Sequence, residues 1–330
     1  MRVLYIGGTG EISTACVWRS VEAGHKVAVF NRGRTEEPLP PGVRHIPGDL
    51  KDPAAYEALG TERFDAVCQF LAYDLATARR DAEVFAGRCG QYVFISTASA
   101  YQKPPTRVVI TEDVPLANPF WPYSQTKADM EAFLLRQHAD GRLPVTIVRP
   151  SHTLRTRFPG GIGRGDDWAW RILHGRPLLV HGDGTALWTL THSEDFAVPF
   201  VGLLGNPKAL GEAFHITRHM KSYPWDAIFQ AMGRALGAEP RLVHVPTDTL
   251  VRYNPEWAGP LLGDKTWSVL FDNSKVMGVV GRFECRVSLD EAMRRSAECY
   301  RRRAAVYQPD ERLHTLFDRI ASNQEGLGLP

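Results

Sequence analysis

Two residues with complementary proton chemistry stand four positions apart in the segment WPYSQTK. Tyr123 and Lys127 lie at the start of an expected helix, where this spacing places both side chains on one face. A phenol has an ordinary pKa of about 10 and becomes a useful base only where a neighbouring cation favours the phenolate. The pair predicts acid–base chemistry, although a YxxxK match also occurs by chance on exposed helices.

A third candidate lies upstream, in the segment VFISTASAY at 93–101. An apolar strand ends here in small hydroxyl residues, at the edge where parallel sheets bind their ligands. We expect Thr97 to hold a substrate oxygen while Tyr123 exchanges a proton, with Ser96 as the nearest competitor. The alternative is that this Ser/Thr run simply ends a strand.

The chain begins with MRVLYIGGTGEIS, in which Gly7, Gly10 and the small Ser13 follow a short apolar run. Glycines leave backbone N–H groups accessible, so that a pyrophosphate can sit at the N-terminus of the following helix. A strand precedes this turn, and a helix and a second strand follow it. The context predicts a dinucleotide cradle, and a glycine-rich turn without a ligand is the alternative.

The elements that must position these residues alternate between strand and helix through the first half of the chain. Apolar runs rich in β-branched and aromatic residues predict strands at 3–6, 25–30, 43–47, 64–70, 91–96 and 145–150. Helices are expected at 12–23, 53–59, 75–88 and 123–138. This alternation predicts an α/β fold class, a Rossmann-type doubly wound parallel sheet.

The regularity loosens after the last of these strands, and a second region begins. We expect a dinucleotide-binding domain over 1–156, with returning segments near 178–217, among which 213–217 supplies a further strand. Residues 157–330 are expected to form mainly a smaller, interleaved C-terminal α/β lobe that binds the substrate.

Composition and charge limit the partners and the compartment. The 330 residues contain 39 Lys and Arg against 37 Asp and Glu, so the formal charge of +2 argues against nucleic acid or a membrane surface as partner. Five scattered cysteines without CxxC spacing favour a reducing compartment. The chain enters a strand at once, and its apolar runs are short of the roughly 20 residues that span a bilayer, so we expect a cytoplasmic protein.

The order of the motifs resembles that of extended short-chain dehydrogenases/reductases, in the NAD-dependent epimerase/dehydratase family. The glycine turn, GDL at 48–50, the hydroxyl-rich strand end, the Tyr–Lys pair, VRP at 148–150 and GDG at 182–184 follow the family's order. FNRGRT and FDNSKV are further similar to the branch of the chloroplast stem-loop-binding proteins and their bacterial relatives. The resemblance implies a homodimer built on the helices at 75–88 and 123–138.

The resemblance also implies roles for individual residues. Tyr123 would be the acid/base, Lys127 would bind the nicotinamide ribose and lower the pKa of the tyrosine, and Thr97 would orient the reacting oxygen. The implied cofactor-binding residues are Gly7, Gly10, Glu11, Ile12, Asn31, Arg32, Arg34, Asp49, Leu50, Leu71, Tyr123, Lys127, Pro150, Ser151 and Thr153, with Asp49 facing the adenine. The expected substrate contacts are Ser99, Tyr101, Trp121, His152, Arg157 and Trp188.

Two departures from the family pattern narrow the chemistry. Dehydratases of the family carry an Asp–Glu pair after the catalytic threonine, where this chain has Ala98 and Ser99, so dehydration of the usual kind is not expected. Many nucleotide-sugar enzymes carry a diphosphate-binding arginine where this chain has Trp188, and an asparagine where it has His152. A UDP- or dTDP-sugar substrate is therefore disfavoured, unless Arg155, Arg157 and Arg164 of the adjoining loop compensate.

A third departure concerns the cofactor. The expected second strand ends in FNRGR at 30–34, without a carboxylate to accept hydrogen bonds from an adenosine ribose. Arg32 and Arg34 favour a 2′-phosphate, so NADP is preferred over NAD. Asn31 can still bind a hydroxyl, which leaves NAD open.

Together these features predict an NAD(P)-dependent epimerase or oxidoreductase acting on a secondary alcohol of a sugar or sugar-like metabolite. The alternative is an RNA-binding or regulatory protein on a dinucleotide-binding fold. No metal is expected, because His181, His192 and His215 lack an HxxxH pattern or a cysteine partner and fit packed or loop positions better.

Overall fold

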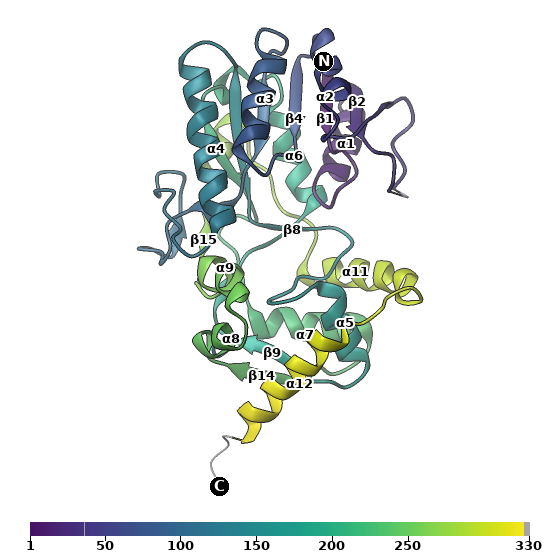
Figure 1. Ribbon diagram of the computed structural model, residues 1–330, viewed down its shortest axis with the longest axis vertical. Helices are drawn as coiled ribbons and strands as arrows, with labels where there is room; N and C mark the ends of the chain where they lie inside the picture. Colours follow the sequence, from purple (N-terminus) through teal and green to yellow (C-terminus); the bar gives the residue numbers. More distant parts are fainter. Residues whose placement is uncertain (36, 327–330) are drawn as a thin grey trace.

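The computed structural model describes residues 1–35 and 37–326, which fold around one seven-stranded parallel sheet (Figure 1). The strand order is β12-β7-β5-β4-β1-β2-β3, and each neighbouring pair runs parallel. The strands are β1 (Arg2–Ile6), β2 (Lys26–Asn31), β3 (Arg44–Pro47), β4 (Ala66–Gln69), β5 (Tyr92–Ile95), β7 (Val145–Pro150) and β12 (Ala213–Ile216). The predicted Rossmann-type sheet is confirmed.

Helices cover both faces of this sheet, which explains why its strands are apolar throughout. On β1, Val3 and Tyr5 join one hydrophobic core, and Leu4 and Ile6 join the other, as the two-residue period of a strand requires. The first core packs against α1 (Ser13–Glu22) and α6 (Ser193–Leu203). The second packs against α2 (Pro53–Glu57), α3 (Leu75–Phe85) and α4 (Pro122–Ala139).

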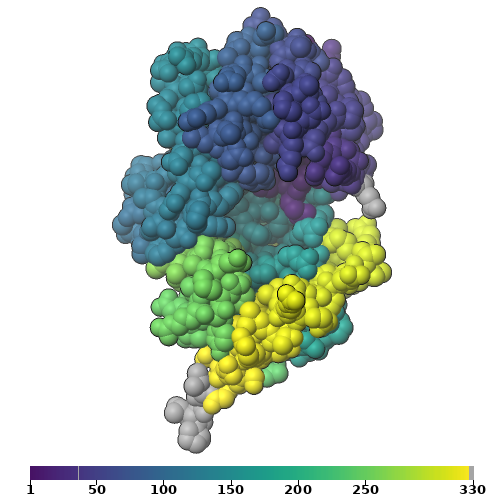
Figure 2. Space-filling view, in the orientation of Figure 1, coloured from purple at the N-terminus to yellow at the C-terminus, as the bar shows by residue number. Residues whose placement is uncertain are grey.

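The C-terminal lobe lies beyond the carboxyl edge of the sheet, and Figure 2 shows a recess between it and the N-terminal part. Its core gathers side chains from a two-stranded sheet and the helices around it. That sheet pairs β9 (Leu178–His181) with β14 (Leu242–Val245), and the helices are α5 (Gly165–Leu173), α7 (Trp225–Leu236), α8 (Thr247–Tyr253), α11 (Leu289–Ala304) and α12 (Glu311–Gly326).

Short elements connect the two parts. Three two-stranded pairs are β6 (Val109–Ile110) with β15 (Leu270–Phe271), β8 (His152–Leu154) with β11 (Leu190–His192), and β10 (Leu187–Trp188) with β13 (Tyr223–Pro224). The short helical segments are η1 (Ala58–Thr61), η2 (Ala98–Ala100), η3 (Pro207–Ala209), η4 (Pro255–Trp257), α9 (Ala258–Pro260), the π-helix η5 (Leu261–Lys265) and α10 (Ser274–Val280).

The chain returns to the main sheet later than the sequence predicts. The segment 213–217 rejoins it as β12, as expected. The strand β9, expected among the returning segments near 178–217, instead pairs with β14 in the lobe. Its residues are apolar in either setting, so the strand pattern alone does not choose between two sheets. Over the described ranges, no helix combines the length and apolar character that crossing a membrane requires.

A buried ion pair fixes α4, the helix that carries Tyr123 and Lys127, against the sheet. The Arg149 guanidinium donates to both carboxylate oxygens of Glu131, at 3.0 Å from Nε and 2.6 Å from Nη2. The side chains are only 6% and 1% exposed. Arg149 also donates to the Tyr101 hydroxyl at 3.1 Å. Each of these buried charges is therefore stabilised mainly by its partner and hardly by water.

Removing one partner of this pair should cost more than removing both. We expect Glu131→Leu to lower the free energy of unfolding by about 3–5 kcal/mol, because it leaves the guanidinium buried and uncompensated. The double variant Glu131→Leu/Arg149→Met should lose clearly less, as measured by urea denaturation. Equal losses in the single and double variants would contradict this account.

Candidate active site

A cleft of about 790 Å³ opens at the carboxyl edge of the main sheet, where the strand ends of a doubly wound fold bind ligands. Its walls come from the turns that follow successive strands and from the start of α4. The lining residues lie within the segments 7–13, 30–35, 48–51, 70–73, 95–97 and 150–153, together with Tyr123 and Lys127. All the sequence-predicted cofactor residues are among them.

The glycine turn needs its glycines for conformation and for space. Gly7 has φ +85°, and a Cβ atom there would lie 2.5 Å from Cγ of Leu71. A Cβ atom on Gly8 would lie 2.8 Å from both methyl groups of Val29. The helix α1 then begins without a side-chain cap and without an acidic residue in its first turn. The positive end of the helix dipole is therefore not neutralised by a capping side chain or an acidic residue of the helix. This arrangement fits the binding of a pyrophosphate.

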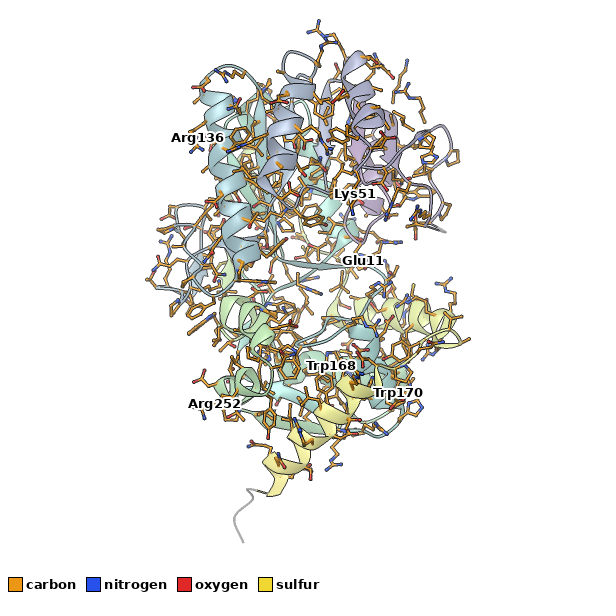
Figure 3. The ribbon with its side chains drawn as sticks, in the orientation of Figure 1. Glu11, Lys51, Arg136, Trp168, Trp170 and Arg252 are labelled. Atoms are coloured by element: carbon orange, nitrogen blue, oxygen red, sulfur yellow. The ribbon has the colours of Figure 1, made fainter. Side chains whose placement is uncertain are left out.

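Glu11, an expected cofactor contact, lines the cleft and also has a structural role. Its carboxylate accepts hydrogen bonds from the backbone N–H groups of Arg155 and Thr156, each at 2.9 Å, and from the Thr156 hydroxyl. Burial raises the pKa of Glu11, but these hydrogen bonds outweigh burial and lower it. Glu11 therefore ties the glycine turn to the segment that leads into the lobe, and Figure 3 places it between the two parts of the molecule.

The end of β2 presents two guanidinium groups to the cleft. Arg32 is half exposed and lies 3.9 Å from the Asp49 carboxylate, and Arg34 lines the same region. The amide of Asn31 is engaged, because it donates to the Thr9 hydroxyl at 3.2 Å and accepts from the Gly33 N–H at 2.9 Å. Two guanidinium groups and the Asp49 carboxylate thus line this region of the cleft.

Sequence reasoning missed the polar residues that hold the walls formed by Leu50 and Leu71. The Gln69 side chain accepts from the Leu71 N–H at 2.8 Å, and Arg80 donates to the Leu50 carbonyl at 2.7 Å. Gln69 is in turn bonded to the buried Asp81 carboxylate at 2.8 Å. The sequence offered no signal for this network, since its members lie in two separate elements, β4 and α3.

The three candidate catalytic residues meet at the inner end of the cleft. Tyr123 and Lys127 project from the first turns of α4, and Thr97 follows β5. The Lys127 ammonium donates to the carbonyls of Ala72 at 2.7 Å and Ile95 at 2.8 Å. Its Nζ atom lies 5.9 Å from the centre of the Tyr123 ring.

The pKa values of this pair depend mainly on burial. Burial raises the pKa of Tyr123 to about 12, the Tyr73 phenol and Asp264 add to this, and a hydrogen bond from Thr97 opposes it. Burial lowers the pKa of Lys127 from 10.5 to about 7, with Glu131 opposing. Burial therefore outweighs the lowering of the tyrosine pKa that was expected from Lys127.

Two aromatic residues expected at the substrate are buried elsewhere. Tyr101 is fully buried, and its hydroxyl lies 3.0 Å from Nδ1 of His215. Trp188 is 1% exposed and stacks on Trp225 with ring centres 4.4 Å apart, inside the core of the lobe. Neither side chain lines the cleft, because both complete hydrophobic cores that the local sequence does not reveal.

The other expected substrate residues divide between the cleft and its surroundings. His152 lines the cleft, and the partly exposed Trp121 lies next to Tyr123 with ring centres 5.1 Å apart. Ser99 is buried against the Ser124 hydroxyl at 2.7 Å. Arg157 is exposed and pairs with a carboxylate of the lobe.

Tyr73, which sequence reasoning missed, lines the cleft near Lys127, whose Nζ atom is 5.0 Å from the centre of its ring. Its segment follows β4 and carries no motif that marks it. Two tryptophans of α5, Trp168 and Trp170, pack within the lobe (Figure 3). Trp168 is fully buried and stacks on Phe317 at 4.8 Å, and Trp170 stacks on His174 at 4.2 Å.

Comparisons with known proteins agree with this architecture. One relative, 2'-dehydrokanamycin reductase of Streptomyces kanamyceticus, is 30% identical over 283 residues, which cover 82% of this chain and 77% of that protein. The chloroplast stem-loop binding protein of 41 kDa b of Arabidopsis thaliana is 28% identical over 271 residues, which cover 77% and 66%. The solved structure of the epimerase Mth375 of Methanothermobacter thermautotrophicus shares the fold, with a TM-score of 0.77 and 17% identity over 92% of this chain and 93% of that one.

The match to a family extends from the first strand to the last strand of the main sheet. Residues 3–217 match the model of the NAD dependent epimerase/dehydratase family, and this range contains the glycine turn, Thr97, Tyr123 and Lys127. The sequence resemblance to this family is therefore confirmed. This chain belongs to the NAD-dependent epimerase/dehydratase family.

Proposed function

We propose that this protein is an NADP-preferring oxidoreductase that interconverts a secondary alcohol and its ketone on a sugar-like metabolite. The observation that carries the proposal is that one cleft unites the glycine turn, two arginines at the end of β2, and the group Thr97, Tyr123 and Lys127. The similarity to a relative named as a reductase of a dehydro-aminoglycoside supports the same reaction class.

The residues of the cleft fit a nicotinamide dinucleotide along its whole length. The turn from Gly7 to Ser13 would hold the pyrophosphate, Arg32 and Arg34 would hold a 2′-phosphate, and Lys127 would bind the nicotinamide ribose. When bound, the cofactor supplies or accepts the hydride. The chain itself must bind the substrate, orient its oxygen and move the proton.

Proton transfer falls to Tyr123. As a phenol with a raised pKa, it donates a proton to the oxygen of a ketone that gains hydride, which makes it a general acid in the reducing direction. The Thr97 hydroxyl would bind the same oxygen, because its hydrogen bond to the Tyr123 phenol places it next to the proton donor. Lys127 in its charged form would stabilise the phenolate left behind.

Retention of the cofactor decides between net oxidoreduction and epimerisation. An epimerase keeps its reduced cofactor bound while the keto intermediate changes orientation, whereas a reductase exchanges it. Mass analysis of the dinucleotide that copurifies with the protein, together with its oxidation state, separates these cases. Tight stoichiometric cofactor indicates an epimerase, and exchangeable cofactor indicates a reductase. Failure to bind either NAD or NADP would refute both.

The RNA-binding alternative has weaker support. It rests on the similarity to the chloroplast stem-loop binding protein. Binding to a phosphate backbone needs clustered free cations, but three of the five arginines of helix α11 are paired with carboxylates, among them Arg303 with Asp166. Arg294 pairs with Glu291 and Glu298, and Arg295 pairs with Glu194 and Glu291.

The tyrosine assignment predicts a selective loss of catalysis. We expect Tyr123→Phe to lower turnover at least about a hundredfold, because it removes the proton donor and keeps the ring. The affinity for NADPH should remain nearly intact. Tyr73→Phe is the matched control, since it removes a second phenol from the same cleft. Turnover that survives in Tyr123→Phe, or an equal loss in both variants, would disprove the assignment.

The buried ammonium of Lys127 predicts a pH-dependent stability difference. The pKa of Lys127 is about 7 in the folded state, against 10.5 for an ordinary lysine. The burial of its charge therefore lowers the free energy of unfolding by its full amount below about pH 7. This loss of stability becomes smaller as the pH rises toward 10.5. Lys127→Met should therefore gain more stability over the wild type at about pH 6 than at about pH 9. Urea denaturation at both values measures the difference. A gain that is constant or larger at the higher pH would count against a buried charge.

The arginines at the end of β2 predict the choice of cofactor. We expect the double variant Arg32→Ala/Arg34→Ala to weaken NADP binding by about tenfold or more and NAD binding little, because only NADP carries the 2′-phosphate. Added salt should reduce the wild-type preference, since these side chains are exposed. Calorimetric titration at two salt concentrations measures both constants. Equal weakening of NAD and NADP would show that the arginines only support the loop.

A further inference from the structure

The arginines that could replace the missing diphosphate-binding arginine are already occupied. All three are paired with carboxylates: Arg155 with Glu37 at 2.9 Å, Arg157 with Asp166 at 3.2 Å, and Arg164 with Asp167 at 3.1 Å. An anion bound near Trp188 would have to compete with these carboxylates for each of them. The expected compensation from this loop is therefore not supported.

Another cation, Lys265, lies beside Trp188. It is the last residue of the π-helix η5, and its side chain is nine-tenths buried. Two donors hold its backbone carbonyl, Nε2 of His181 at 2.9 Å and Nε1 of Trp225 at 3.1 Å. The backbone position of this lysine is thus fixed by the core of the lobe.

Aromatic rings connect the Lys265 ammonium to the catalytic cleft on two sides. The Nζ atom lies 5.7 Å from the ring centre of Trp121 and 5.3 Å from that of Trp188. The Trp121 ring adjoins Tyr123 at 5.1 Å, and the Trp188 ring adjoins His152 at 4.6 Å. Tyr123 and His152 both line the cleft, so a single tryptophan ring separates the ammonium from the cleft wall at each of these two residues.

The hydrogen-bonding capacity of this ammonium is not used by the chain. Across residues 1–35 and 37–326, its Nζ atom has an ion partner in Asp264 at 3.8 Å but no hydrogen-bond acceptor. The buried Lys103 is also within the electrostatic range of Asp264, so two ammonium groups share one carboxylate. The Glu11 carboxylate is another negative charge that affects this region, since it raises the pKa of His152. It already accepts hydrogen bonds from Arg155 and Thr156.

The Lys265 side chain keeps 10% of its surface exposed and has open donor positions, so an anionic oxygen that approaches the ammonium could complete its hydrogen bonds. The local excess of positive charge selects an anionic oxygen, and the neighbouring Trp121 offers a face on which a sugar ring can pack. A lysine provides a point charge, which suits one carboxylate or one phosphate group.

We propose that Lys265 binds an anionic oxygen group of the substrate, a carboxylate or a phosphate, and so orients a charged sugar beside Tyr123. The inference rests on the proposed function and narrows its substrate class to acidic sugars. Lys265 supplies from a distant segment the positive charge that is missing at position 188.

The test compares three sugars that share one ring, namely glucuronate, glucose 6-phosphate and glucose. Each is titrated by calorimetry into the full-length protein saturated with NADP. We expect glucuronate or glucose 6-phosphate to bind at millimolar concentration and glucose to bind at least about tenfold more weakly, a difference that added salt reduces. The acidic sugar that binds more tightly identifies the anion as carboxylate or phosphate.

Three variants make the test specific to the contact. Lys265→Met should weaken the acidic sugar at least about tenfold, and Lys265→Arg should restore most of the binding. Lys103→Met is the matched control, because it removes one charge from the same cluster but not the charge between the tryptophans, and it should change binding much less. NADP binding should be unchanged in all three.

Several results would overturn the inference. These are equal binding of the acidic sugar to the wild type and to Lys265→Met, an equal loss in Lys103→Met, preference for glucose, or no binding of either acidic sugar. A wild-type protein that failed to bind NADP would instead refute the proposed function. Lys265→Met protein that keeps its NADP affinity is folded, so a loss of sugar binding in it reports on the contact.

Discussion

The two hydrogen bonds from the Lys127 ammonium to the carbonyls of Ala72 and Ile95 join the elements on which the site depends. Ala72 follows β4, Ile95 ends β5, and Lys127 belongs to α4, so one side chain sets the distance between two strand ends and a helix. Tyr123 lies one turn earlier on the same helix. These contacts place the Lys127 ammonium in the protein interior, where it loses contact with water. The same burial lowers its pKa to about 7.

Four buried cations of the described residues show two kinds of environment. Arg149 has a complete partner in Glu131, and Arg171 is fully buried against Asp318 and two backbone carbonyls, so both serve the fold. Lys127 and Lys265 lie beside the cleft without a carboxylate in hydrogen-bond contact. An incompletely paired buried charge destabilises a protein, so the environment of these two lysines supports the ligand-binding roles proposed for them.

The sequence predicted most of the framework and part of the site. Strands and glycine turns are local patterns, so the main sheet and the cradle from Gly7 to Ser13 followed from short segments. The environment of a polar or aromatic side chain depends on distant segments. Tyr101 was expected at the substrate, but its burial depends on His215, which is 114 residues away in sequence. The pKa of Tyr123 could not be derived either, because burial controls it.

The position of Trp188 shows how the packing of the lobe can control the chemistry of the cleft. Its ring stacks on Trp225 in the hydrophobic core, where an arginine would bury its charge without a partner. The same Trp225 donates to the Lys265 carbonyl and so fixes the segment that brings an ammonium close to the Trp188 ring. One aromatic cluster thus excludes a cation at position 188 and positions another cation 5.3 Å from the Trp188 ring centre. The lobe core and the two cores of the main sheet are separate hydrophobic clusters. A substitution in the lobe can therefore change which segment carries a charged side chain without displacing the catalytic residues beside the main sheet.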